Sequence, residues 1–145
     1  MSKPKQKHVP ALMREVLELL APQAGESYLD LTAGYGGHAG AILELTKTPG
    51  SATLIDRDPA AADTLKDKFK DTQIVHSDFL WASQKLLQQG KKYDIILADL
   101  GVSSLHLDEA SRGFSFSQGG PLDMRMDPTQ HLSASDIVNS WSEKD

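Results

Sequence analysis

The sequence contains no cysteine among its 145 residues, which excludes disulfide bridges, thiolate zinc sites and thiol nucleophiles. This absence is typical of a reducing compartment, so we expect a cytoplasmic protein. No apolar run approaches the roughly 18 residues of a membrane span, and the basic residues 1–7 lead into no signal peptide. Basic residues are too few for bulk electrostatic binding of nucleic acid, because 15 Lys and Arg stand against 20 Asp and Glu. Any contact with a nucleic acid is therefore expected to involve only a small part of the protein surface.

The length is typical of one domain, which can bury roughly 68–70% of its unfolded surface. Short extended apolar segments alternate along the chain with segments of helical period, and Asp58 with Pro59 is typical of a helix start. This alternation predicts a doubly wound parallel α/β sheet with helices on both faces. The expected strands cover residues 27–31, 52–56, 73–76 and 93–100, and the expected helices cover residues 8–21, 39–45, 59–69 and 79–89.

The alternation stops after residue 100, where Gly, Ser, Pro and Asp dominate a long segment over residues 101–132. Loops of that length inside a compact domain are usually functional. A short helix over residues 133–141 follows, with Ser133 as its N-cap and Asp136 placed to complete a capping box. No fifth strand is expected.

A glycine-rich loop follows the first expected strand, at the end of the sheet where ligands bind in open α/β folds. It reads Gly34-Tyr-Gly-Gly-His-Ala39, and its missing side chains let a ligand approach the backbone. Asp56 ends the second expected strand, about 20 residues later, where a carboxylate can accept both hydroxyls of a ribose. The pattern predicts a ligand that contains a nucleoside. The alternative is that the glycines only make a tight turn and that Asp56 only caps the next helix.

Carboxylates dominate the expected strand ends, which carry Asp30, Asp56, Asp58, Asp78 and Asp99. The glycine loop has no Lys or Arg and lacks the Lys-Ser/Thr pair of a Walker loop, which excludes that kind of phosphate cradle. Such carboxylates would repel a pyrophosphate but complement S-adenosylmethionine, whose sulfonium is cationic. Methyl transfer is therefore favoured, and an NAD-dependent oxidoreductase is a distant alternative.

Six motifs stand in one register along the chain. They are His8-Val-Pro10, Asp30-Leu-Thr-Ala-Gly-Tyr-Gly-Gly-His38, Ile55-Asp-Arg-Asp-Pro59, Asp99-Leu-Gly-Val-Ser-Ser104, Arg112-Gly-Phe-Ser-Phe-Ser117 and Gly120-Pro-Leu-Asp-Met-Arg-Met-Asp127. Together they resemble the MraW/RsmH family of ribosomal RNA cytosine-N4 methyltransferases. The resemblance implies a class I, Rossmann-like methyltransferase that uses S-adenosylmethionine and methylates a cytidine in 16S RNA of the small ribosomal subunit.

The resemblance also implies which residues hold the cofactor. Phe79 would pack on the adenine face, although it could instead be a core residue in the first turn of a helix. Asp99 would lie beside the methyl group and accept a hydrogen bond from the exocyclic amine of the cytosine. This hydrogen bond would raise the nucleophilicity of the amine. The alternative for Asp99 is a carboxylate that caps a turn. Gly36, Gly37 and His38 would lie along the methionine end, Asp56 would hold the ribose, and Asp30 and Gly34 would complete the cofactor site.

The sequence departs from related patterns at two places. His106 stands where the family commonly has a glutamine that contacts the cofactor, and an imidazole can still form a hydrogen bond there. The aromatic signature that follows the fourth strand in DNA amino-methyltransferases is absent, so Phe114 or Phe116 would have to stack on the base. Arg112 and Arg125 could join them in an RNA-facing lid. Equally, the aromatic residues could anchor the loop to the core.

By resemblance, we expect a flexible basic tail over residues 1–7, a cofactor-binding domain over residues 8–110, and a loop with the start of a helical substrate-recognition insertion over residues 111–145. Family chains are longer, so the fold is expected to be incomplete on its C-terminal side. The strand over residues 93–100 would then be an apolar edge that a partner chain or a second copy covers. No metal is expected. The alternative function is a cofactor-binding remnant or regulatory module without turnover.

Overall fold

The computed structural model describes residues 10–144, and only the backbone of residues 104 and 105. The basic tail over residues 1–7 and the first two residues of the motif His8-Val-Pro10 lie outside this range. The chain divides into two compact units, unit 1 (Met1–Asp99) and unit 2 (Leu100–Asp145). The predicted domain boundary after residue 110 stays a prediction. Within the described range, no helix is long and apolar enough to cross a membrane.

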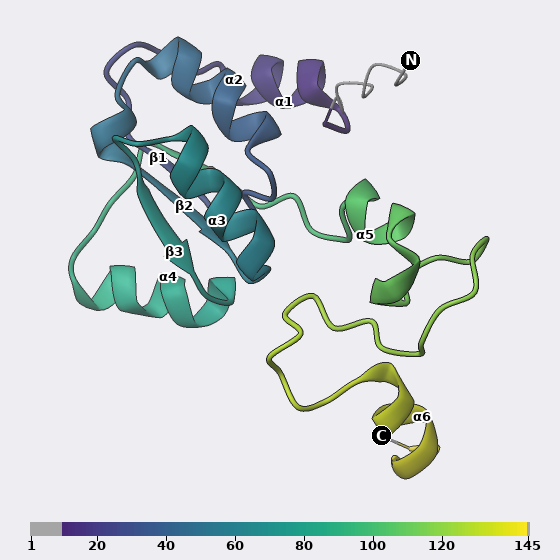
Figure 1. Cartoon of the computed structure of the whole chain (residues 1–145). Helices are drawn as coiled ribbons and strands as arrows, with labels where there is room; N and C mark the ends of the chain where they lie inside the picture. Colours follow the sequence, from purple (N-terminus) through teal and green to yellow (C-terminus); the bar gives the residue numbers. More distant parts are fainter. Residues whose placement is uncertain (1–9, 145) are drawn as a thin grey trace, which may run out of the picture. The chain divides into compact units, whose positions relative to one another are not determined.

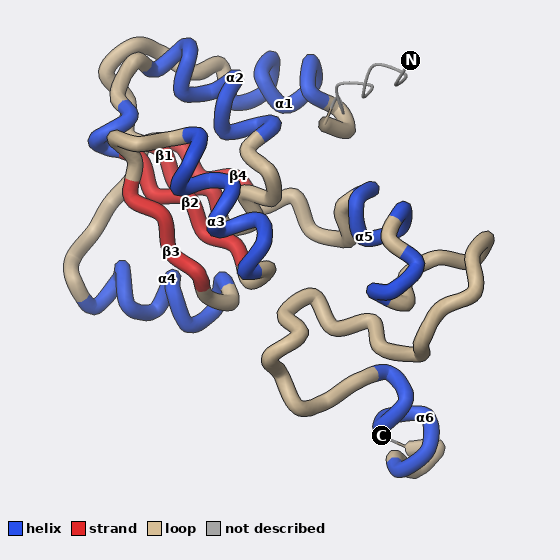
Figure 2. The backbone as a smooth tube through the Cα atoms, in the orientation of Figure 1, coloured by secondary structure: helices blue, strands red, loops and turns tan. Residues whose placement is uncertain are grey.

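Unit 1 alternates helices and parallel strands, as Figures 1 and 2 show. The elements are α1 (Met13–Leu20), β1 (Tyr28–Asp30), α2 (Gly37–Thr46), the 3₁₀ helix η1 (Pro49–Ser51), β2 (Ala52–Asp56), α3 (Pro59–Lys68), β3 (Gln73–His76), α4 (Phe79–Gln88) and β4 (Ile95–Leu97). The predicted bounds of β2 and β3 are confirmed. The strands β1 and β4 are shorter than predicted, and α2 begins earlier.

The four strands form one sheet in the order β3-β2-β1-β4. Tyr28 of β1 pairs with Ala52 of β2 on one side and with Ile95 of β4 on the other. The order of the strands therefore reverses at β1. In open α/β sheets, a reversal of this kind opens a crevice beyond the carboxyl ends of the strands, and ligands bind there.

Both faces of the sheet are covered, which confirms the doubly wound arrangement. Tyr28 and Leu54 are fully buried in an apolar cluster that also receives side chains from α1, α2 and α3. Leu29 and Ile55, whose positions alternate with these along the strands, pack in a second cluster against α4. Figure 2 shows α4 on the opposite side of the sheet from α2 and α3. The period-two pattern of the strands thus supplies two cores.

Local contacts explain where the helices begin. Asp58 caps α3 by accepting a hydrogen bond from the backbone N–H of Ala60, with Pro59 in the first turn, as predicted. The predicted helix over residues 8–21 needs correction, because residues 10–12 are not helical and α1 begins at Met13. Leu12 adopts the left-handed conformation with φ 54°, which interrupts a continuous helix at that point.

The strand predicted over residues 93–100 is reduced to the three residues of β4. At its start, Asp94 is held by Ser27, whose backbone N–H and hydroxyl both donate to the Asp94 carboxylate. At its end, the backbone N–H of Asp99 donates to the Thr32 hydroxyl. At both ends of β4, hydrogen bonds that involve side chains therefore replace the backbone hydrogen bonds of the sheet. Within the described residues β4 is an edge strand, as expected, but a short one.

Unit 2 contains α5 (Ser104–Asp108), the 3₁₀ helix η2 (Ala110–Arg112) and α6 (Ala134–Ser140), with irregular backbone between them. Ser133 caps α6, and its reciprocal contact with Asp136 confirms the predicted capping box. Phe114 and His106 are both 7% exposed, with ring centroids 5.2 Å apart. The aromatic pair and a set of polar contacts organise this unit.

Candidate functional site

The carboxyl ends of the strands gather acidic side chains at one end of the unit 1 sheet. Asp30 ends β1, Asp56 ends β2 and Asp99 lies just after β4. The charges of Asp56 and Asp99 both contribute to raising the pKa of Asp30, so the three groups are within electrostatic reach of one another. Two further carboxylates of the predicted set, Asp58 and Asp78, cap α3 and α4. They serve the local structure of these helices.

The glycines of the loop differ in what surrounds them. A Cβ on Gly36 would lie 2.4 Å from Phe69 of the adjacent segment, and a Cβ on Gly37 would lie 2.2 Å from Pro10. These two glycines therefore permit packing within the chain. A Cβ on Gly34 would meet nothing within 4 Å, and its φ of +53° is left-handed. Gly34 is thus the loop position beside open space.

Asp56 ties this loop to the end of β2. Its two oxygens accept hydrogen bonds from the backbone N–H groups of Gly34 at 2.7 Å and Asp58 at 2.8 Å. The alternative that Asp56 caps the next helix is wrong, because Asp58 is the N-cap of α3. Each carboxylate oxygen has a second lone pair, so Asp56 can still accept hydrogen bonds from a vicinal diol.

Lys68 holds the loop from the side of α3. Its ammonium donates to the carbonyl oxygen of Gly36 at 2.9 Å and lies 5.0 Å from the centroid of the Phe69 ring. The backbone N–H of Gly36 donates to Ala33 at 2.8 Å. The loop is therefore ordered by the chain's own contacts, which is the preorganisation a ligand site needs.

Asp30 lies beneath the site, with 1% of its surface exposed. Its carboxylate accepts hydrogen bonds from the Tyr28 hydroxyl at 2.5 Å and from the Thr32 backbone N–H at 3.1 Å. Burial raises the pKa of Asp30 to about 6, and burial also raises the pKa of Tyr28. The structure gives Asp30 the role of a buried anchor, and a direct contact with a cofactor is still a prediction.

His38 and Asp99 lie close together at the carboxyl end of the sheet. The Nε2 atom of His38, in the first turn of α2, lies 3.6 Å from Oδ2 of Asp99. The His38 side chain is only 9% exposed, whereas that of Asp99 is 57% exposed. Neither ring nitrogen of His38 has a hydrogen-bond partner among the described residues, which is unusual for a buried imidazole. A polar ligand group at this place would satisfy it.

The alternatives for Phe79 and Asp99 find no support. Phe79 opens α4, is 43% exposed and belongs to neither apolar cluster, so it is not a core residue. The Asp99 carboxylate accepts no backbone hydrogen bond within residues 10–144, so it caps no turn there. Both side chains are left available at the carboxyl end of the sheet. Their contacts with a cofactor stay predictions.

In unit 2, the two candidate aromatic residues have different surroundings. Phe114 is buried against His106, whose Nδ1 lies 3.2 Å from the Ser103 hydroxyl. Phe116 is fully exposed. Phe114 therefore packs within unit 2 and belongs to neither apolar cluster of unit 1. Only Phe116 presents a free ring face to stack on a base.

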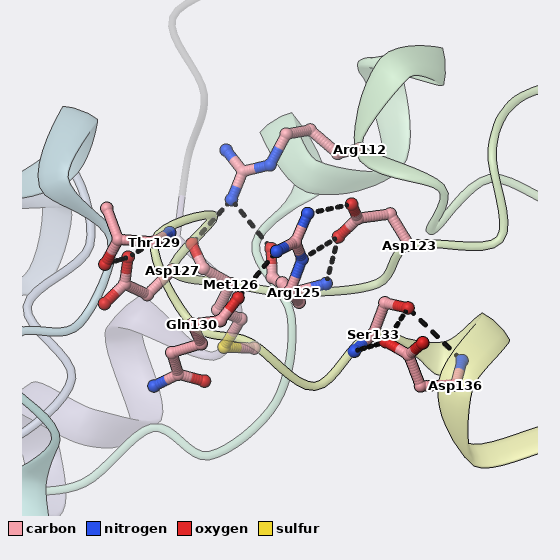
Figure 3. A network of polar contacts seen from close by, with 9 residues as sticks. All are labelled: Arg112, Asp123, Arg125, Met126, Asp127, Thr129, Gln130, Ser133 and Asp136. Carbon is pink, nitrogen blue, oxygen red and sulfur yellow. Dashed lines mark hydrogen bonds and ion pairs between the residues drawn. The ribbon is translucent and has the colours of Figure 1, made fainter. Parts of the chain in front are cut away.

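The two predicted RNA-facing arginines bind the backbone of unit 2 (Figure 3). Arg112 donates to the carbonyl oxygen of Met126 at 2.6 Å. Arg125 forms a fork with Asp123, at 2.9 Å from Nε and 2.6 Å from Nη2, and also donates to Gln130. The guanidinium of Arg125 lowers the pKa of Asp123 to about 2. These contacts organise the loop, and a contact of either arginine with RNA stays a prediction.

Sequence reasoning missed two residues of this arrangement, Thr32 and Tyr28. Thr32 stands inside the motif Asp30-Leu-Thr, directly after a strand, where a hydroxyl commonly bonds nearby backbone. The position of Thr32 directly after the strand was therefore the sequence signal that could have identified it. Within residues 10–144, no group of three or more His, Asp or Glu side chains is placed to hold a metal ion.

Comparisons with known proteins agree with this fold and these motifs. A family model described as the MraW methylase family matches residues 5–145. Ribosomal RNA small subunit methyltransferase H of Rickettsia bellii is 46% identical over 144 residues, which cover 97% of this chain and 46% of that protein. The protein of the same name from Acidobacterium capsulatum is 38% identical over 151 residues, covering 97% of this chain and 50% of that protein. This chain thus spans about half the length of the curated relatives it matches.

A solved structure supports the fold alone. The crystal structure of NSun6 from Pyrococcus horikoshii with SFG superposes with a TM-score of 0.53 at 21% identity. The match covers 70% of this chain and 29% of that protein. The predicted Rossmann-like α/β fold is therefore confirmed.

Proposed function

Because the chain belongs to the MraW methylase family, we propose that it binds S-adenosylmethionine and serves the N4-methylation of a cytidine in 16S RNA of the small ribosomal subunit. The observation that carries the proposal is the carboxyl end of the sheet at β1, where Gly34 borders open space and the carboxylates of Asp56 and Asp99 lie. A cationic ligand with a ribose fits this combination of negative charge and open space.

The residues of unit 1 fit the parts of this cofactor. Asp56 has lone pairs for the ribose hydroxyls, and its position is held by Gly34 and Asp58. Phe79 has an exposed ring for the adenine. The two unsatisfied nitrogens of His38 suit the polar groups of the methionine end. When bound, the cofactor supplies an electrophilic methyl group next to these side chains.

Asp99 is the residue we assign to the reaction. The amine of cytosine is a weak nucleophile, since its lone pair is delocalised into the ring. A hydrogen bond from this amine to the exposed Asp99 carboxylate localises the lone pair, and the same carboxylate takes the proton that the methylated nitrogen must lose. The remaining contribution of the chain is positioning, because methyl transfer is an in-line displacement.

Unit 2 is our candidate for contact with RNA, in keeping with the predicted insertion over residues 111–145. The full exposure of Phe116 supports it, because unpaired bases are commonly held by stacking on aromatic rings. A cofactor-binding remnant or regulatory module without turnover is the second candidate, because the residues fitted above to the parts of the cofactor all lie in unit 1. The cytoplasmic location and a partner covering the β4 edge stay predictions.

Calorimetric titration with S-adenosylmethionine tests the cofactor site. We expect saturable binding that Asp56→Ala weakens by at least about tenfold, since two charge-assisted hydrogen bonds are lost. The matched control is Asp63→Ala, which removes an exposed carboxylate of α3 paired with Lys66. A folded chain that does not bind overturns the cofactor assignment, and binding of NADH instead would favour the oxidoreductase.

Transfer of a labelled methyl group to 16S RNA then separates the two candidate functions. Labelled N4-methylcytidine that disappears with Asp99→Ala supports the enzyme. Cofactor binding without transfer to intact small subunits or to free 16S RNA favours the remnant.

A further inference from the structure

Thr32 connects the buried carboxylate of Asp30 with the backbone of Asp99. It lies between the end of β1 and the glycine loop, and its backbone N–H donates to Oδ1 of Asp30 at 3.1 Å. Its hydroxyl oxygen accepts the backbone N–H of Asp99 at 2.7 Å. A single residue thus joins two acidic positions that are far apart in the sequence.

The hydroxyl of Thr32 replaces a bond of the sheet. The last ladder contact between β1 and β4 runs from the N–H of Leu31 to the carbonyl oxygen of Leu97, at 2.9 Å. In a continued parallel pair, the N–H of Asp99 would next bond a backbone carbonyl of the neighbouring strand. It bonds the side chain of Thr32 instead, and β4 ends there. We call the hydrogen bond from the Asp99 N–H to the Thr32 hydroxyl the tether. It sets the place at which the chain leaves the sheet after β4.

The tether itself is anchored in the core. Tyr28 is fully buried and donates its hydroxyl to Asp30, whose other oxygen accepts the N–H of Thr32. This arrangement fixes the backbone of Thr32, and a β-branched side chain has few rotamers to choose from. On the far side, the carboxylate of Asp99 is held 3.6 Å from the buried ring of His38. Asp99 is thus held at its backbone, while its carboxylate stays more than half exposed.

We propose that Thr32 is a positioning residue, whose hydroxyl holds Asp99 where its carboxylate can accept the proton of the reacting amine. This inference rests on the proposed function and deepens it. Thr32 acts through Asp99, whose backbone N–H its hydroxyl accepts. Without this hydrogen bond, Asp99 samples more orientations. Ligand binding and the reaction must then include the entropic cost of ordering Asp99, which weakens the binding and slows the reaction.

Two variants separate the hydroxyl from the shape of the side chain. Thr32→Val keeps the branched shape and removes the acceptor, whereas Thr32→Ser keeps the acceptor. Amide hydrogen exchange in the whole chain reports the tether directly. We expect the Asp99 amide to exchange about fivefold faster in Thr32→Val, the effect of one net hydrogen bond, and to be unchanged in Thr32→Ser. The amide of Leu31, bonded to Leu97, serves as the reference for an intact sheet. Equal protection of Asp99 in Thr32→Val and the parent chain would overturn the tether.

A double-mutant cycle then tests whether the tether acts through Asp99. We expect Thr32→Val to weaken binding of S-adenosylmethionine about fivefold, with Thr32→Ser restoring it, and to have no effect in an Asp99→Ala background. The same loss in both backgrounds would mean a general structural effect and would contradict the proposal. If the parent chain binds no cofactor, the proposed function fails, while the exchange measurement still decides whether Thr32 holds Asp99.

Discussion

Unit 1 and unit 2 are stabilised by different kinds of contact. Unit 1 buries apolar side chains on both faces of a parallel sheet, with Tyr28, Leu54 and Ile55 fully enclosed. In unit 2, among the side chains that the structure describes, only His106 and Phe114 are buried, and polar contacts hold the irregular backbone. Burial of apolar area is a larger and less pH-dependent source of stability than exposed polar contacts. We therefore expect unit 1 to be the more stable of the two.

The units also differ in whether their charged side chains are already paired within the chain. At the carboxyl end of the unit 1 sheet, the carboxylate of Asp99 stays exposed and its neighbour His38 lacks hydrogen-bond partners among the described residues. In unit 2, Arg112 and Arg125 are bound to carbonyl groups and to Asp123. Charges are thus available for a ligand in unit 1, whereas in unit 2 the arginines maintain the fold. The surroundings of a charged residue in the fold therefore decide whether it is free to bind a ligand or stabilises the chain.

The largest expected effect comes from the core of unit 1. Leu54→Ala should lower the free energy of unfolding by roughly 3–5 kcal/mol, because a fully buried leucine leaves a cavity. The matched control is Leu87→Ala on α4, where the side chain is 77% exposed and the loss should be under about 0.5 kcal/mol. Urea unfolding followed by circular dichroism measures both. Equal losses would contradict the account of the unit 1 core.

A pH-dependent effect of about 3 kcal/mol is expected from Asp30, because burial raises its pKa from 3.8 to about 6. The folded chain binds this proton more tightly than the unfolded chain. Stability should therefore fall as the pH rises from about 4 to about 6. Urea unfolding between pH 4 and 7 should show this decline in the parent chain and a flatter profile in Asp30→Asn. Asp63→Asn, on the surface of α3, should keep the decline, and an unchanged profile in Asp30→Asn would refute the assignment.

Unit 2 should be sensitive at Gly113, where φ is +77° and a Cβ would lie 2.2 Å from the carbonyl oxygen of Pro121. Gly113→Ala should destabilise unit 2 by about 2 kcal/mol, since both strain and a backbone clash are introduced. Gly119→Ala is the matched control, because no atom lies within 4 Å of its Cβ position. Hydrogen exchange at the Met124 amide, bonded to Arg112, reports the difference. Similar exchange in both variants would count against an ordered unit 2.

The smallest effect is expected at the cap of α6. Ser133→Ala should cost about 1 kcal/mol of local stability, because the N–H of Asp136 loses its acceptor. Ser133→Thr keeps the hydroxyl and should cost little. Amide exchange of Ile137, bonded to Ser133, measures the change, and a loss as large as that of Leu54→Ala would reverse the comparison between the units.

Much of unit 1 could be predicted because its local signals and its tertiary structure agree. The bounds of β2 and β3, the cap at Asp58 and the helices on both faces follow from period and capping residues. The beginning of α1 could not, since nothing in its composition announces a left-handed Leu12. The end of β4 depended on the Thr32 hydroxyl of another segment. Errors of this kind arise where a distant group competes with the local pattern.

The sequence alone determined the fold class, the glycine loop and the acidic strand ends, because period, glycine and charge are properties of short segments. Only the tertiary structure decided that Gly34 faces open space, that Asp30 is buried and that Phe116 is exposed while Phe114 is not. It also decided that Arg125 pairs with Asp123 and that Thr32 holds Asp99. Exposure and partnership are set by which segments the fold brings together. A residue type and its neighbours in the chain do not contain that information.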